Sequence, residues 1–112
     1  MIRTNAALTP QNKNRLLAAV ARSVADSLDK PIQDVMVMLC GCDMVKGIDC
    51  GVAAFVECRL ARCVDTSRYP DACSAINDVL NDVAGIASSM VYTEFSVVSP
   101  GCAFRFDKEA AS

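Results

Sequence analysis

Two stretches, Leu16–Leu28 (LLAAVARSVADSL) and Asp71–Val83 (DACSAINDVLNDV), carry apolar residues at helical spacing and lie 55 positions apart in the chain. The first predicts a helix from Pro10 to Leu28. Thr9 is its expected N-cap, and Pro10 stands in the first helical position, where a missing N–H costs nothing. The second stretch predicts another helix over its own length. The chain therefore repeats one helix-containing unit.

Strand patterns accompany both helices. Val52–Leu60 alternates and predicts a strand with one apolar face, and Met90–Val98 predicts the last strand. Asp34–Cys40 is apolar at both parities and predicts a strand buried on both faces. Helical crossovers make the two strands of each repeat parallel. We therefore expect an α+β fold, with two β-α-β pseudo-repeats forming a four-stranded mixed sheet that has both helices on one face.

The first strand of this scheme is short. The 55-residue shift places the counterpart of Val52 about three positions before Met1, so the first strand is expected to be about four residues shorter than its partner. The sheet face opposite the helices also needs cover. Identical subunits would supply it most simply, so self-association is expected from the pattern alone.

Length and composition restrict the class of protein. A chain of 112 residues, 53% hydrophobic and 21% charged, fits one globular domain over residues 1–112. A net charge of -2 argues against nucleic acid as a partner. No apolar run reaches the roughly 20 residues that span a bilayer, and the N-terminus lacks the apolar core of a secretory signal. We expect a cytoplasmic chain with no membrane partner.

The chain has seven cysteines and no histidine. An odd number cannot pair fully within one chain, so we expect mostly reduced thiols, as is usual in the cytosol. Cys58 and Cys73 fall in apolar patterns and are expected to pack as small hydrophobes. A zinc site from Cys40, Cys42 and Cys50 is a weaker alternative, because this spacing lacks paired C-x₂₋₄-C motifs. We expect no metal and no cofactor.

Two segments resemble a known family. Ser27–Val37 (SLDKPIQDVMV) is similar to the G-K-P-x-x-x-V-M stretch of the macrophage migration inhibitory factor family, in the tautomerase superfamily, and Met90–Phe95 (MVYTEF) is similar to its R-[VI]-Y-x-x-[FY] strand. The resemblance runs without gaps over nearly the whole chain. It implies a homotrimer that tautomerises phenylpyruvate- and dopachrome-like substrates. It also implies a second location outside the cell, since animal members are cytokines secreted without a signal peptide.

The resemblance also implies a site for a small aromatic 2-keto acid, without a cofactor. Lys30 would bind the substrate carboxylate, Ala61 would line the pocket, and Tyr92 would come from the neighbouring subunit. Glu94 stands where the family has asparagine, and we expect it to pair with one of the arginines Arg59, Arg62 and Arg68. The family's general base is an N-terminal proline amine, whose pKa an apolar pocket lowers.

That proline aligns about three positions before Met1, in agreement with the internal repeat. Three strand residues span roughly 10 Å, so the Met1 amine does not take its place. We expect Met1 to be retained before the bulky Ile2, and we name no catalytic residue with certainty. Two functions stay open. One is an isomerase whose native chain carries the proline, and the other is a non-catalytic, cytokine-like or binding trimer with a protein receptor.

Overall fold

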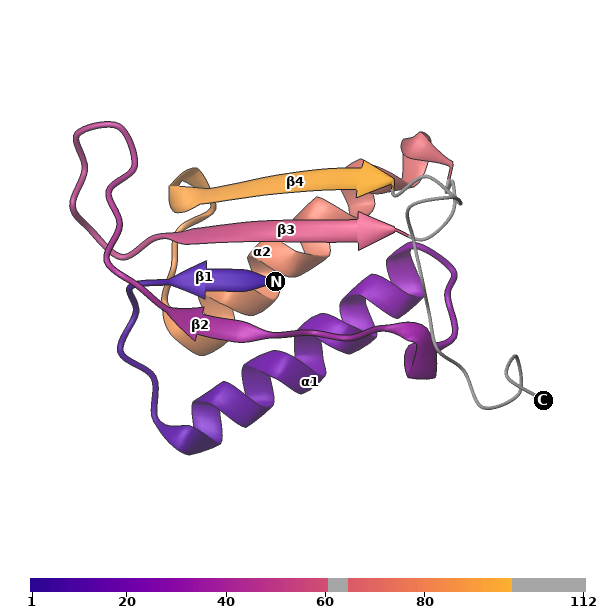
Figure 1. Cartoon of the computed structure of the whole chain (residues 1–112), viewed down its shortest axis with the longest axis horizontal. Helices are drawn as coiled ribbons and strands as arrows, with labels where there is room; N and C mark the ends of the chain where they lie inside the picture. The colour runs from indigo at the N-terminus through magenta and orange to yellow at the C-terminus, as the bar shows by residue number, and fades with distance from the viewer. Residues whose placement is uncertain (61–64, 98–112) are drawn as a thin grey trace.

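A computed structural model describes residues 1–60 and 65–97. Four strands and two α-helices follow one another in the predicted order (Figure 1). In chain order they are β1 Ile2–Thr4, α1 Pro10–Ser27, β2 Leu39–Gly41, β3 Ala54–Leu60, α2 Tyr69–Ala84 and β4 Val91–Val97. No helix in this part of the chain is long and apolar enough to cross a membrane.

Local chemistry fixes both ends of the helices. The Thr9 hydroxyl accepts a hydrogen bond from the Asn12 N–H at 3.1 Å, and Pro10 opens α1, as the sequence predicts. Just beyond the end of α1, Asp29 adopts a left-handed backbone with φ 53°. Helix α2 ends at Ala84, and its C-cap Gly85 adopts the same left-handed backbone region at φ 68°, where glycine has no side chain to clash.

The sheet has the order β2-β1-β3-β4. β1 pairs parallel with β2 and antiparallel with β3, and β3 pairs parallel with β4. Each helix is therefore the crossover of one parallel pair, and the predicted double β-α-β arrangement is confirmed. Both helices lie against the same face of the sheet (Figure 1).

The core lies between that face and the helices. Every second residue of β1 and β3 points into it, and so does one stripe of each helix. Its fully enclosed members include Ile2, Leu16, Val56, Ile76, Leu80 and Ile86. A smaller cluster joins Leu28, at the end of α1, to Leu60, at the end of β3. This second cluster brings the end of α1 to the last residue of β3.

The predicted strand Asp34–Cys40 is wrong in length and burial. Ile32–Asp34 form a 3₁₀ turn, and β2 covers only Leu39–Gly41. Met36 is 82% exposed and Met38 49%, whereas Val37 and Leu39 pack against the core. The helices cover one face of the sheet, and no second layer formed by residues 1–60 and 65–97 covers the side chains that point the other way.

The short first strand is confirmed. β1 has three residues and β3 has seven. Figure 1 shows the N-terminus partway along the sheet, with β3 and β4 running on beyond it. β3 itself begins at Ala54, two residues after the predicted start, and Val52 before it is 44% exposed.

Candidate functional site

The sheet face opposite the helices, called here the open face, carries most of the polar chemistry. Residues paired in register share a face of the sheet, and Ile2, Val56 and Thr93 are on the helix-covered face. The residues that alternate with them along each strand therefore lie on the open face. It carries Met1, Arg3, Cys40, Phe55, Glu57, Arg59, Tyr92 and Glu94. These residues come from all four strands.

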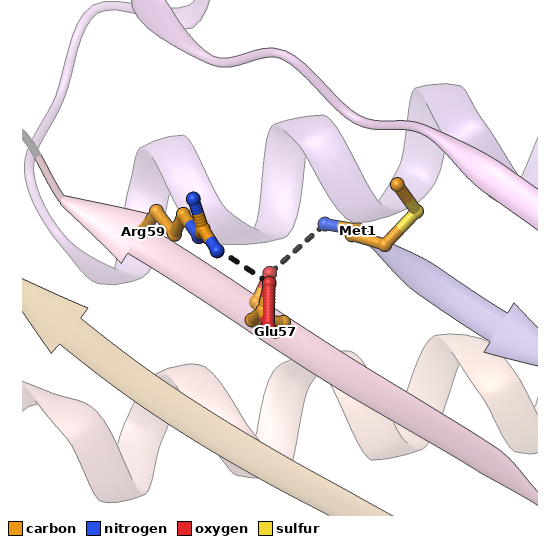
Figure 2. Close-up of polar contacts among 3 residues, drawn as sticks. All are labelled: Met1, Glu57 and Arg59. Carbon is orange, nitrogen blue, oxygen red and sulfur yellow. Dashed lines mark hydrogen bonds and ion pairs between the residues drawn. The ribbon is translucent and has the colours of Figure 1, made fainter.

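The Met1 amine is held in the sheet. It donates a hydrogen bond to the Glu57 carbonyl at 2.9 Å, and the Glu57 N–H donates to the Met1 carbonyl at 2.8 Å (Figure 2). The Glu57 carboxylate in turn lies 3.3 Å from Nε of Arg59. Met1 and Glu57 thus form a closed antiparallel pair. Among the described residues, the β1 side of the ladder ends here, and Cys58–Leu60 of β3 extend past it.

Lys30 lies at the far end of β3. Its backbone N–H donates to the Ala25 carbonyl at 2.8 Å, which closes the end of α1. Two residues earlier, Leu28 packs with Leu60. Lys30 is half-buried and forms no ion pair with any residue in the two described ranges.

Tyr92 lies at the opposite end. It stands in register with Phe55, and the two rings stack with centroids 5.3 Å apart. Tyr92 is still 54% exposed. Phe55 and Leu60 are five residue steps apart along β3, which is roughly 17 Å. One chain therefore does not bring Lys30 and Tyr92 together.

Among the described residues, Glu94 pairs with neither Arg59 nor Arg68. Arg59 bonds to Glu57 instead, Arg62 lies outside the described residues, and no ion pair joins Arg68 to Glu94. Glu94 is the register partner of Glu57, so two carboxylates stand side by side on the open face. Like charges in such a pair repel each other. The Arg59 guanidinium instead binds Glu57, which lies two residues away on the same strand and on the same face.

Phe55 and Glu57 were not singled out from the sequence. Alternation in Val52–Leu60 does place them together on one face. Their partnership with Tyr92 and Glu94 depends on β3 lying beside β4 in this register, which no local pattern reveals.

The cysteines behave as two groups. Cys40, Cys42 and Cys50 are exposed and free. Burial raises the pKa of the Cys58 thiol, with the N-terminal amine opposing and Cys73 adding to the rise, and burial alone raises the pKa of Cys73. No three His, Cys, Asp or Glu residues gather around a common point in the described part of the chain. The zinc alternative therefore gains no support from the geometry.

A shallow hollow of about 310 Å³ lies where β1 leads into α1. Ala6, Leu8, Lys13 and Leu39 are among its lining residues. None of the site residues predicted from the sequence lines it.

No protein-family model and no curated protein sequence matches the chain. Solved structures do. The macrophage migration inhibitory factor of Toxoplasma gondii is similar at 25% identity and a TM-score of 0.83, with 96% of each chain covered. The chain has the macrophage migration inhibitory factor fold.

Two further structures agree with this. A macrophage migration inhibitory factor-like protein from Entamoeba histolytica is similar at 17% identity and a TM-score of 0.84, covering 95% of this chain and 91% of its own. The macrophage migration inhibitory factor of Trichinella spiralis is similar at 23% identity and a TM-score of 0.77. The match covers 95% of this chain and 93% of the Trichinella chain. The resemblance of Ser27–Val37 and Met90–Phe95 is confirmed at the level of the fold.

Within this macrophage migration inhibitory factor fold, the structure places three of the four predicted site residues. Lys30 lies near the end of β3, and Tyr92 and Glu94 lie on the open face. Ala61 lies outside the described residues. Their roles in binding stay predictions.

Proposed function

We propose that this chain is a macrophage migration inhibitory factor-like homotrimer whose tautomerase activity depends on a proline-led segment before Met1. The substrates would be compounds of the phenylpyruvate or dopachrome type. The observation that carries the proposal is the hydrogen bond of the Met1 amine to the Glu57 carbonyl, 2.9 Å long and inside the sheet.

A general base must offer a lone pair to the substrate at the reacting carbon. The Met1 amine donates inside the ladder and lies three strand residues, roughly 10 Å, from where the family's proline would stand, so it does not take the place of that base. A residue three positions earlier would pair opposite Leu60 if the antiparallel register continued. Leu28 packs against Leu60, so an amine there would lie near Lys30.

The division of the site residues supports assembly from several subunits. Lys30 and Tyr92 lie at opposite ends of β3, roughly 17 Å apart along the strand. A pocket that uses both would take Tyr92 from a neighbouring copy. The Lys30 ammonium would attract the substrate carboxylate, the Tyr92 ring would form an aromatic wall, and Glu94 would weaken anion binding by repulsion.

A non-catalytic role is the second candidate. The position of Glu94 favours it, because its carboxylate stands beside that of Glu57 on the open face and would repel an anionic substrate. The trimer would then serve as a binding or cytokine-like module that recognises a protein receptor.

Phenylpyruvate tautomerisation separates the two candidates. We expect little activity from the 112-residue chain, and an increase of about 10²–10⁴-fold when the tripeptide Pro-Thr-Val precedes Met1. The tripeptide Ala-Thr-Val is the matched control, since it extends β1 without a secondary amine. Equal rates for both extensions would contradict the role of proline. Family-like activity of the chain that starts at Met1 would contradict the proposal itself.

A further inference from the structure

Sulfur-containing side chains alternate along residues 36–42, the segment that contains β2. Met36, Met38, Cys40 and Cys42 occupy every second position of MVMLCGC. Val37 and Leu39 pack against the core, so the side chains of the other parity point away from it. All four sulfur residues are exposed. We call them the sulfur stripe.

The backbone holds most of the stripe extended against β1. The Ile2 N–H donates to the Met38 carbonyl at 2.8 Å, and the Cys42 N–H donates to the Thr4 carbonyl at 3.0 Å. The parallel ladder between these bonds fixes the run from Met38 to Cys42. Their side chains therefore share the open face with Met1 and Arg3.

A fifth sulfur reaches the stripe from β1. The Cys40 thiol lies 3.8 Å from the thioether sulfur of Met1 and donates a weak hydrogen bond to it. A thiol and a thioether from two neighbouring strands are thus already in contact on an exposed surface.

We propose that Cys40, Cys42 and Met1 bind one Cu(I) ion. Thiolate and thioether sulfurs are soft ligands, which select Cu(I) over the harder divalent ions. The chain contains no histidine, and the described residues offer no cluster of carboxylates beside the stripe. Two cysteines fall short of the four ligands of a structural zinc site, and a thioether is not among the ligands that zinc uses.

The spacing of the Cys40 and Met1 sulfurs suits a three-coordinate ion. With metal–sulfur bonds of about 2.3 Å, as for a zinc thiolate, two sulfurs on a trigonal ion lie about 4 Å apart. The observed Cys40–Met1 separation of 3.8 Å needs almost no movement. Cys42, one strand repeat along the same face, supplies the third sulfur.

The charge also balances. Binding releases the two thiol protons to solvent and leaves two thiolates around one monovalent cation. The resulting charge of -1 lies beside Arg3, which is the register partner of Cys40. The proposal concerns binding alone, so it stands or falls independently of the tautomerase activity.

The test is competition for Cu(I) against bicinchoninate under anaerobic, reducing conditions, with the full chain. We expect wild type and Cys50→Ser to bind one equivalent with the same affinity, since Cys50 is an exposed cysteine outside the stripe. Cys40→Ser and Cys42→Ser should each lose about 100-fold or more, because loss of even an outer-shell partner costs about 10–100-fold. Zn(II) should bind far more weakly.

A second measurement on wild type avoids the question of whether the variants fold. Ag(I) is a redox-inert probe of the same softness, and methionine methyl groups labelled with ¹³C report its ligation. One equivalent should shift the Met1 methyl resonance, assigned by elimination with Met36→Leu, Met38→Leu, Met44→Leu and Met90→Leu, and leave that of Met90, which packs against the core, in place. The proposal is overturned if the Met1 resonance stays unchanged, or if Cys40→Ser binds Cu(I) as tightly as Cys50→Ser.

Discussion

Burial separates the thiols at the scale of single residues. It raises the pKa of Cys58 above its ordinary 9.0 and that of Cys73 in the same direction, whereas Cys40, Cys42 and Cys50 are exposed. The thiolate is the nucleophile. We expect iodoacetamide at pH 8 to modify Cys50 before Cys58 and Cys73, as followed by peptide mapping. Modification of Cys58 ahead of Cys50 would contradict this burial.

The raised pKa of Cys58 also predicts a pH dependence of stability. The folded chain favours the neutral thiol, so the unfolded chain ionises first as the pH rises through about 9. The free energy of unfolding should therefore fall from that pH upward. Cys58→Ala should flatten this decline in urea titrations, and Cys50→Ala, which alters an exposed thiol, should leave it unchanged.

Lys30 and Glu94 give opposite expectations for an anionic ligand. Lys30→Ala should weaken phenylpyruvate binding by about tenfold or more, since a hydrogen bond to a charged group contributes about 1.5–3 kcal/mol. Glu94→Gln should strengthen it by removing a repulsion. Calorimetric titration measures both, with Lys46→Ala, at an exposed loop lysine, as the control. Equal affinities for wild type, Lys30→Ala and Glu94→Gln would remove the proposed pocket.

At the scale of elements, the two helix ends differ in chemistry. Asp29 adopts φ 53° with a side chain that opposes it, and Gly85 adopts φ 68° with none. We expect Asp29→Gly to raise the free energy of unfolding by up to about 1 kcal/mol and Gly85→Ala to lower it by about 1 kcal/mol. Urea unfolding of both variants checks this. Destabilisation by Asp29→Gly would show that the Asp29 side chain stabilises this turn.

The helices could be predicted because their signals are local. Apolar periodicity and the Thr9–Pro10 cap act within a few residues, and α1 begins where they place it. The prediction of a strand buried on both faces over Asp34–Cys40 was wrong, because the burial of a strand depends on whether a second layer covers it. Apolar residues at successive positions could not show that no layer of described residues covers Met36 and Met38.

At the scale of the whole molecule, the sequence predicted the sheet and its short first strand through the internal repeat. It did not predict how the site is distributed. The Phe55–Tyr92 stack and the Glu57–Glu94 pair depend on strand order and register, which are properties of the assembled sheet. The distance between Lys30 and Tyr92 likewise emerges only once β3 lies between them.

Assembly is the central claim, because the open face needs cover and the proposed pocket needs a second copy. Sedimentation equilibrium at micromolar concentration tests it most directly. The account predicts a single species of three times the 11.9 kDa chain mass. A stable monomer of 11.9 kDa at that concentration would contradict it.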